Sequence, residues 1–306
     1  MDIKNFAIIS GSSLTLKEGK LIYKAPQSEK IKETVDVKNK DDDTIDVVNV
    51  RSDVTFGNGI LEFSLKTTSY NTGALALFKS SDNKEIACGY SRIYNQFVIL
   101  LTDVQARKVL AKAGTLSNYN LNEEILFKIE IKGSSLSLLI NNITLCETSI
   151  SIKEAPIEMN VSADANFEVF NIKAKKSAPK IFIVMQFSKE YNELYEEVIK
   201  PVSEKFGYEC IRADEFYTGT PIISDIIASI QEATAIIAEI TPDNPNVFYE
   251  IGYSHAIKKP TILLCDKTRD KLPFDLSSFR TLFYENTIAG KKKVELSLTK
   301  YLDNIK

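Results

Sequence analysis

Residues 235–262, AIIAEITPDNPNVFYEIGYSHAIKKPTI, indicate how the C-terminal part of this chain folds. Residues 235–240 and 261–265 are short apolar runs, which are typical of buried strands. Between them, a loop rich in proline and asparagine leads into a helical segment at 248–257. Strand, helix and strand in this order predict a parallel βαβ unit. Glu250 is then expected near the start of the helix, where open α/β sheets bind their ligands.

The residues on both sides of this unit continue the alternation of strands and helices. A helix that begins after Ser188 and runs to about residue 206 must be kinked or interrupted at Pro201. The other predicted strands are 181–185, 208–211 and 281–284, and the other predicted helices are 222–233 and 292–304. This order predicts a doubly wound parallel sheet of about five strands.

Residues 6–173 have the pattern of β-structure throughout, with no helical stretch. Apolar and polar residues alternate clearly at 60–65 and 127–131, which marks strands with one buried face. The predicted strands are 20–25, 44–50, 59–67, 73–79, 97–102, 126–132, 135–140 and 166–174. Many short strands in succession predict an antiparallel β-sandwich. Tyr90, Tyr94 and Phe97 are interpreted as core residues rather than as a ligand platform.

A short basic segment, AKKSAPK at 174–180, separates the two patterns. Its small residues, lysines and proline are typical of a linker. We therefore expect a β-sandwich domain at 1–174, a linker at 175–179 and an α/β domain at 180–306. A chain of 306 residues is long enough for two cores of ordinary size.

Composition excludes several classes of function. A net charge of −3 and a pI near 5.5 give no general attraction to DNA or to an anionic membrane. No apolar run approaches the ~18 residues of a membrane span. The single histidine argues against a His-rich metal site, and four scattered cysteines without a CxxC pair predict a reducing, cytoplasmic setting. The acidic run at 40–43 is interpreted as a charged loop tip, so no metal is predicted.

Several polar residues follow the predicted strands directly and are expected to meet at one edge of the sheet. Glu250 is the candidate catalytic residue. The candidate substrate-binding residues are Gln186, Phe187, Ser188, Arg212, Asp214, Thr241, Asn246, Tyr249 and Ser254. The helix after Ser188 offers free N–H groups to an anion, and Arg212 is a cation suited to phosphate. Two of these assignments have an alternative that stays open. Arg212 and Asp214 can pair with each other in a salt bridge without binding a ligand, and Ser254 can lie on the helix surface instead of contacting the ribose.

The N-terminal strand-and-turn phrases resemble those of concanavalin-like jelly-roll domains. These phrases are FGNGILEF at 56–63, GALALF at 73–78, FKIEIKG at 127–133, LLINN at 138–142 and FEVFNI at 167–172. The resemblance implies a folded module that senses a ligand or forms an oligomer. Glycan binding does not follow from it, because the phrases contain strands and turns rather than a binding motif.

The C-terminal phrases resemble bacterial TIR-like domains and the related nucleoside 2-deoxyribosyltransferase-like group. They are VMQFS at 184–188, RAD at 212–214, IAEIT at 237–241, NPNVFYEIGYSHA at 244–256 and KP at 259–260. The resemblance spans 180–306 and implies a flavodoxin-like parallel sheet with helices on both faces. Gln186 and Glu239 depart from the proline and aspartate of many relatives, which puts substrate details in question.

In both groups, the glutamate that matches Glu250 acts at the anomeric carbon of an N-ribosyl bond. The resemblance therefore implies an NAD⁺ glycohydrolase, with NAD⁺ as substrate and no cofactor. A carboxylate beneath C1′ stabilises the positive charge that develops there, and nicotinamide leaves as a neutral molecule. Prokaryotic antiphage effectors of this kind are switched on by assembly, which implies a homo-oligomer and a trigger ligand at the β-sandwich.

Two further functions are kept as alternatives. The first is a nucleoside 2-deoxyribosyltransferase-like N-glycosidase that acts on nucleosides or nucleotides. Its neutral leaving base needs a proton donor, for which Asp214 or Glu239 is available. The second is a non-catalytic module that binds a nucleotide or scaffolds a partner.

Overall fold

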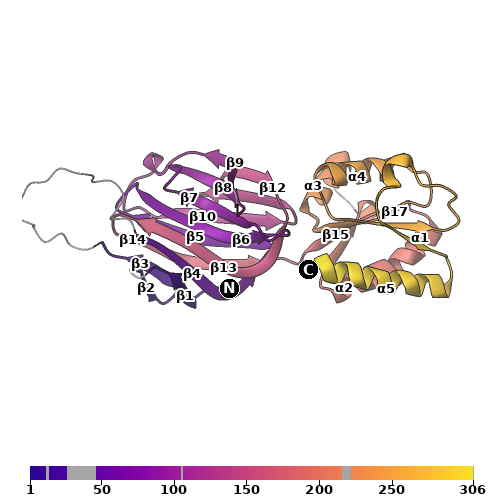
Figure 1. Ribbon diagram of the computed structural model, residues 1–306, viewed down its shortest axis with the longest axis horizontal. Helices are drawn as coiled ribbons and strands as arrows, with labels where there is room; N and C mark the ends of the chain where they lie inside the picture. Colours follow the sequence, from indigo (N-terminus) through magenta and orange to yellow (C-terminus); the bar gives the residue numbers. More distant parts are fainter. Residues whose placement is uncertain (12–13, 26–45, 105, 216–221, 306) are drawn as a thin grey trace, which may run out of the picture. The chain divides into compact units, whose positions relative to one another are not determined.

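The computed structural model describes residues 1–11, 14–25, 46–104, 106–215 and 222–305 (Figure 1). The chain forms two compact units. The N-terminal unit comprises residues 1–131, 136–148 and 152–176, and the C-terminal unit comprises residues 132–135, 149–151 and 177–306. The acidic run at 40–43 lies outside the described residues. In the described part of the chain, no helix is long and apolar enough to cross a membrane.

Among the described residues, the N-terminal unit has two seven-stranded sheets, and the predicted antiparallel β-sandwich is confirmed. In order across the sheet, sheet I contains β1 (Phe6–Ser10), β4 (Asp46–Phe56), β13 (Ile152–Ala163), β6 (Thr72–Ser80), β7 (Glu85–Ser91), β8 (Gln96–Thr102) and β9 (Arg107–Ala113). Sheet II contains β12 (Ile143–Ser149), β11 (Ser135–Ile140), β10 (Ile125–Lys132), β5 (Gly59–Thr67), β14 (Phe167–Lys176), β3 (Lys20–Tyr23) and β2 (Leu14–Lys17).

Aromatic side chains from both sheets form the core of the sandwich. Phe63 of β5 stacks on Phe127 of β10, with ring centroids 4.7 Å apart. Phe97 of β8 approaches the same Phe127 from sheet I, at 5.8 Å. Tyr90 and Phe97 are completely buried, so their interpretation as core residues is confirmed. Tyr94 is only partly buried and packs against the edge of a smaller cluster on sheet I. Strand β14 continues through Lys176, because its last residues pair with the start of β5.

The C-terminal unit contains a parallel sheet, sheet III, with strand order β16-β15-β17-β18-β19. Its strands are β15 (Lys180–Val184), β16 (Glu209–Arg212), β17 (Ala235–Glu239), β18 (Thr261–Asp266) and β19 (Thr281–Tyr284). The helices of this unit are α1 (Lys189–Leu194), η2 (Tyr195–Ile199), α2 (Lys200–Lys205), η3 (Ala213–Glu215), α3 (Ile222–Glu232), α4 (Pro245–Ala256), η4 (Phe274–Leu276) and α5 (Ile288–Ile305), while η1 (Leu116–Asn118) belongs to the N-terminal unit.

Alternate residues of the central strands enter two separate cores. Ile181 and Ile183 pack with buried residues of α1, α2 and α5. Phe182 and Val184 pack with buried residues of α3 and α4. Because one strand contributes to both cores, sheet III carries helices on each of its faces, as Figure 1 also shows. Strands β15, β17 and β18 are accordingly almost continuous apolar runs.

The helix after Ser188 continues through Pro201, so the interruption that the sequence allowed there does not occur. Segments α1, η2 and α2 follow one another without a break, and η2 is a π-helical segment. The N–H of Lys200 donates to the carbonyl of Tyr195, five residues earlier. Proline lacks an N–H and clashes with an α-helical carbonyl. The wider turn before Pro201 provides the space that the ring needs.

Candidate active site

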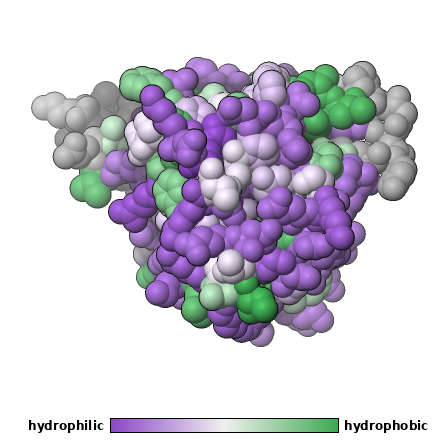
Figure 2. All heavy atoms as spheres, turned by 90° about the vertical axis from the view of Figure 1, so that its right-hand side faces the viewer, coloured by the Kyte–Doolittle hydropathy of each residue, from purple (hydrophilic) through white to green (hydrophobic). Residues whose placement is uncertain are grey.

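A cavity of about 560 Å³ lies at the carboxyl ends of β15 and β16, beside helices α3 and α4. Six of the ten predicted site residues line it, and they are Gln186, Phe187, Asp214, Asn246, Tyr249 and Glu250. Their roles toward a ligand stay predictions. The surface of the C-terminal unit in Figure 2 is mostly hydrophilic, with hydrophobic side chains in small separate groups. The cavity lining itself combines apolar and polar side chains, which suits a small molecule of mixed polarity.

Helix α4 places Glu250 in the cavity wall. The helix starts three residues earlier than predicted, because Pro245 occupies its first turn and Asn244 caps it. The Asn244 side chain accepts a hydrogen bond of 3.0 Å from the N–H of Asn246. Glu250 therefore lies in the second turn, beside the buried Val247 and Ile251.

The Glu250 carboxyl is set in an apolar environment. Only 9% of the residue is exposed, and burial raises its pKa from 4.5 to about 7. Burial acts this way because it disfavours the charged form. A carboxyl group with this pKa holds its proton at mildly acidic pH and can release it near neutrality. Glu250 is thus suited to act as a proton donor.

Asp214 brings a second carboxyl group to the same cavity. It lies in η3, directly after β16, and its side chain is 33% exposed. Arg212 binds both of its oxygens: Nε donates to Oδ1 over 2.9 Å, and Nη2 bonds to Oδ2. Asp214 is therefore an ion-paired carboxylate, whereas Glu250 is a buried acid.

The Arg212 side chain is held by several contacts within the protein. Its side chain is buried, and Nη1 donates to Asn192 over 3.1 Å. The guanidinium carbon lies 4.4 Å from the ring centre of Tyr195 and 5.3 Å from that of Phe187. Of the two alternatives for Arg212 and Asp214, the structure has the salt bridge, and Arg212 does not line the cavity.

Three other predicted residues also lie outside the cavity lining. Ser188 precedes α1, but its side chain makes no capping hydrogen bond. Thr241 donates to Glu239 and accepts from the N–H of Asp266 over 2.7 Å. Ser254 is completely buried and donates to the backbone carbonyl of Glu250 over 2.7 Å. It supports helix α4 from within and is neither a ligand contact nor a surface residue.

The apolar residues of the cavity wall are not among the predicted site residues. Ile222 and Ile223 of α3 line the cavity and are exposed. The helical spacing of isoleucines in α3 predicts a core face, and Ile226 and Ile230 do occupy one. The additional isoleucines at the start of the helix are the only signal for a second, ligand-facing role.

Glu239 resembles Glu250 in burial but not in position. It is 1% exposed, and burial raises its pKa to about 7. Its carboxylate accepts hydrogen bonds from Thr241 and from the hydroxyl of Tyr284, the latter over 3.2 Å. It does not line the cavity that contains Glu250.

A second hollow, of about 410 Å³, lies on sheet I. We call it the sheet I groove. Polar side chains from β4 and β13 are paired along it: Arg51 with Glu158, and Asn49 with Asn160. Leu75, Leu77 and Leu100 are among its apolar lining residues. Arg92 and Arg107 also line it, and within the described residues neither guanidinium has a hydrogen-bond or ion-pair partner.

Comparison with known proteins gave matches among solved structures only, since no family model and no curated protein matches the chain. The carbohydrate-binding module CBM66 from Bacillus subtilis is 12% identical, with a TM-score of 0.40, over 56% of this chain and 95% of that chain. The GlcNAcα1-4Gal-releasing endo-β-galactosidase from Clostridium perfringens is 10% identical, with a TM-score of 0.39, over 54% and 57%. The β-glucanase from Bacillus licheniformis is 10% identical, with a TM-score of 0.38, over 56% and 92%.

The prediction of a TIR-like NAD⁺ glycohydrolase is wrong. The three structures named above are carbohydrate-binding or carbohydrate-cleaving proteins, and they give no support to the TIR-like or deoxyribosyltransferase-like resemblance. Arg212, expected to hold a phosphate, is buried against Asp214. The nucleoside 2-deoxyribosyltransferase-like alternative rests on the same resemblance and is rejected with it.

Proposed function

We propose that the C-terminal unit hydrolyses a glycosidic bond to oxygen in a small sugar-containing substrate. The observation that carries this proposal is the contrast between two carboxyl groups in one cavity. Glu250 is buried, with its pKa raised to about 7, and Asp214 is paired with Arg212. Environments that separate two carboxyl groups in this way define an acid and a carboxylate, the pair that glycoside hydrolysis uses.

The proposed step uses both groups once. Glu250 donates its proton to the glycosidic oxygen, the bond from C1 to that oxygen breaks, and the leaving group departs as an alcohol. Asp214 either attacks C1 or removes a proton from the water that attacks it. In the first route the Glu250 carboxylate then takes the proton of the hydrolytic water. In the second route the two groups return to their starting states by exchange with solvent, and the anomer of the product distinguishes the routes.

The cavity suggests the size and surface of the substrate. A volume of about 560 Å³ lies within the ~300–1,000 Å³ of ordinary small-molecule sites. Phe187 and Tyr249 line it and are each about half exposed, so their rings can pack on a sugar or on an aromatic leaving group. Gln186 and Asn246 offer amide groups to hydroxyls.

The predicted fold of the C-terminal unit is compatible with this proposal. The strand order of sheet III and its helices on two faces favour a flavodoxin-type fold for the C-terminal unit. The domain limits 1–174 and 180–306, the homo-oligomer and the cytoplasmic setting stay predictions.

The full chain is expected to release sugar from a panel of aryl and alkyl glycosides, with a characteristic pH dependence. Glu250 must carry its proton, so activity should be high below pH 7 and should fall as the pH rises through the Glu250 pKa of about 7. The measurement is kcat/KM against pH. Glu239→Gln is the matched control, because Glu239 has a similarly raised pKa but lies outside the cavity.

The control variant should keep the alkaline decline of the wild type. If Glu239→Gln removes that decline, or if no glycoside of the panel is cleaved, the proposal is overturned.

We also propose that the sheet I groove binds an anionic saccharide. Sugars present C–H faces and hydroxyls, which the leucines and the paired polar side chains of the groove can contact. The two arginines without partners in the described residues favour a carboxylate or sulfate on that sugar.

Replacing both Arg92 and Arg107 with alanine should weaken uronate-oligosaccharide binding roughly tenfold or more, because each charged hydrogen bond contributes about 1.5–3 kcal/mol. Calorimetry with charged and neutral oligosaccharides of equal length measures the effect. Arg280→Ala, an exposed arginine in the C-terminal unit, is the control. Equal affinity for neutral and charged sugars would contradict the assignment.

A further inference from the structure

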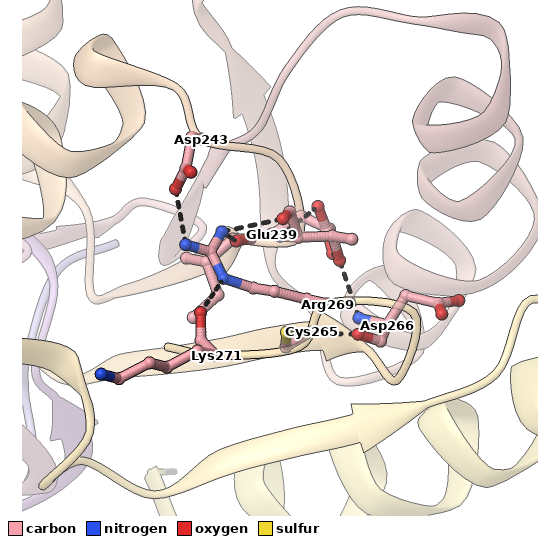
Figure 3. Close-up of polar contacts among 8 residues, drawn as sticks. Glu239, Asp243, Cys265, Asp266, Arg269 and Lys271 are labelled. Carbon is pink, nitrogen blue, oxygen red and sulfur yellow. Dashed lines mark hydrogen bonds and ion pairs between the residues drawn. The ribbon is translucent and has the colours of Figure 1, made fainter. Parts of the chain in front are cut away.

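One arginine joins two loops at the carboxyl edge of sheet III (Figure 3). Arg269 follows β18, and its side chain is only 10% exposed. Its Nη1 donates to the carbonyls of Ile240 and Thr241, over 2.6 and 2.8 Å. Its Nη2 donates to the Asp243 carboxylate over 2.5 Å, and its Nε donates to the carbonyl of Lys271 over 2.8 Å.

These four acceptors belong to two different segments. Residues 240–243 form the loop between β17 and α4, whereas Lys271 belongs to the loop after β18. The planar guanidinium presents several donors in a fixed geometry, so it can hold both segments at once. Its carbon also lies 5.9 Å from the ring centre of Phe248, in the first turns of α4.

The clamped loop leads directly into the helix that carries Glu250. Asp243 precedes Asn244, the residue that caps α4. Any movement of residues 240–243 therefore shifts the first turn of α4, and Glu250 lies in the second turn. The depth at which Glu250 is buried thus depends on where this loop holds the helix.

We propose that Arg269 is a positioning residue for Glu250, acting through the loop that begins α4 and not through contact with substrate. Arg269 does not line the cavity, and Glu250 is not among its bonding partners in the described residues. Burial is the cause of the raised pKa of Glu250. An effect of Arg269 on turnover rests on the proposed function. Its effect on the position of Glu250 does not depend on that function.

The test is a carbon-13 NMR titration of the glutamate carboxyl groups in the full chain, comparing wild type, Arg269→Met and Arg269→Lys. The Glu250 signal is identified by its loss in Glu250→Gln. In Arg269→Met the loop loosens and water reaches the carboxyl, so the Glu250 pKa should move down from about 7 toward 4.5. Arg269→Lys keeps the charge but not the forked geometry, so it should shift the pKa in the same direction.

The direction of the shift separates positioning from simple electrostatics. Loss of a cation that acted by its charge would raise a carboxyl pKa instead. Lys267→Met is the matched control, because it removes an exposed ion pair with Glu285 just after β18 and should leave the Glu250 pKa unchanged. An unchanged or raised Glu250 pKa in folded Arg269→Met would overturn the proposal. Absence of glycosidase activity in the wild type would overturn the proposed function without affecting this titration.

Discussion

Glu250→Gln is expected to lower kcat/KM for alkyl glycosides by about 10²–10⁴-fold, the usual contribution of a positioned general acid. The amide keeps the size of the side chain but cannot donate an acidic proton. Glycosides of strongly acidic phenols should lose much less, because their leaving groups depart without protonation. The measurement is kcat/KM across a series of leaving groups of falling pKa, for wild type and variant.

The dependence of kcat/KM on the pKa of the leaving group shows whether Glu250 acts as the general acid. A steep dependence in the variant and a shallow one in the wild type identify Glu250 as the acid. If both glycoside classes lose activity equally, Glu250 acts as a nucleophile or a structural residue, and the assignment fails.

The same substitution should stabilise the fold at alkaline pH. Because the pKa of Glu250 is raised from 4.5 in the unfolded chain to about 7, the folded state holds this proton more tightly. Its contribution to stability is fully present below pH 4.5 and is lost as the pH rises through about 7. The amide that replaces the carboxyl group does not ionise, so at pH 8 the variant should be more stable by on the order of 1–3 kcal/mol. Higher stability with lost activity excludes unfolding as the cause.

The strands that could be predicted are those whose side chains alternate. Both limits of β5 and β11 agree with the prediction, since their apolar residues face one core in regular alternation. Strand β7 was not predicted, because EIACGYS contains small residues and Gly89. Gly89 has φ +146°, and a Cβ there would lie 2.3 Å from the carbonyl oxygen of Ala74. Gly89 lets the two neighbouring strands approach closely, whereas a glycine in the sequence alone suggests a turn.

Strand β13 could not be predicted from the sequence for a different reason. Its segment, IKEAPIEMNVSA, lies between β4 and β6 at the centre of sheet I and was not predicted. Pro156 precedes an irregularity in the pairing with β4, after which the alternation resumes. A proline within a central strand argues against that strand unless the bulge is known, and only the partner strands reveal the bulge.

In the candidate site too, the sequence predicted positions that depend on topology but not contacts that depend on packing. The order of strand, loop and helix was enough to place Glu250 at the sheet edge, because topology alone determines that position. The sequence left the pairing of Arg212 with Asp214 as one of two alternatives. The partner of Ser254 could not be predicted, since it depends on which atoms packing brings together. The protonation of Glu250 depends on burial in the same way. Residue type therefore predicted the location of the carboxyl groups but not their chemistry.

Asp214→Ala should abolish turnover and weaken folding, and a small external anion should restore both. Without its carboxylate, the Arg212 guanidinium stays buried beside Tyr195 and Phe187 with its charge unpaired. The cost to the free energy of unfolding is roughly 1–3 kcal/mol, because Asp214 itself is partly exposed. The loss in kcat/KM should reach at least the ~10²–10⁴-fold expected for an acid–base group.

Azide or formate can occupy the space left by the side chain and pair with Arg212. Melting curves should then show higher stability with rising azide, and hydrolysis assays should yield a sugar azide as azide replaces the carboxylate or the water at C1. Glu215→Ala removes the adjacent, exposed carboxylate, which does not line the cavity, and should show neither loss nor rescue. Rescue of stability without rescue of turnover would leave Asp214 only a structural partner of Arg212, because the anion would then pair with the guanidinium without serving the reaction.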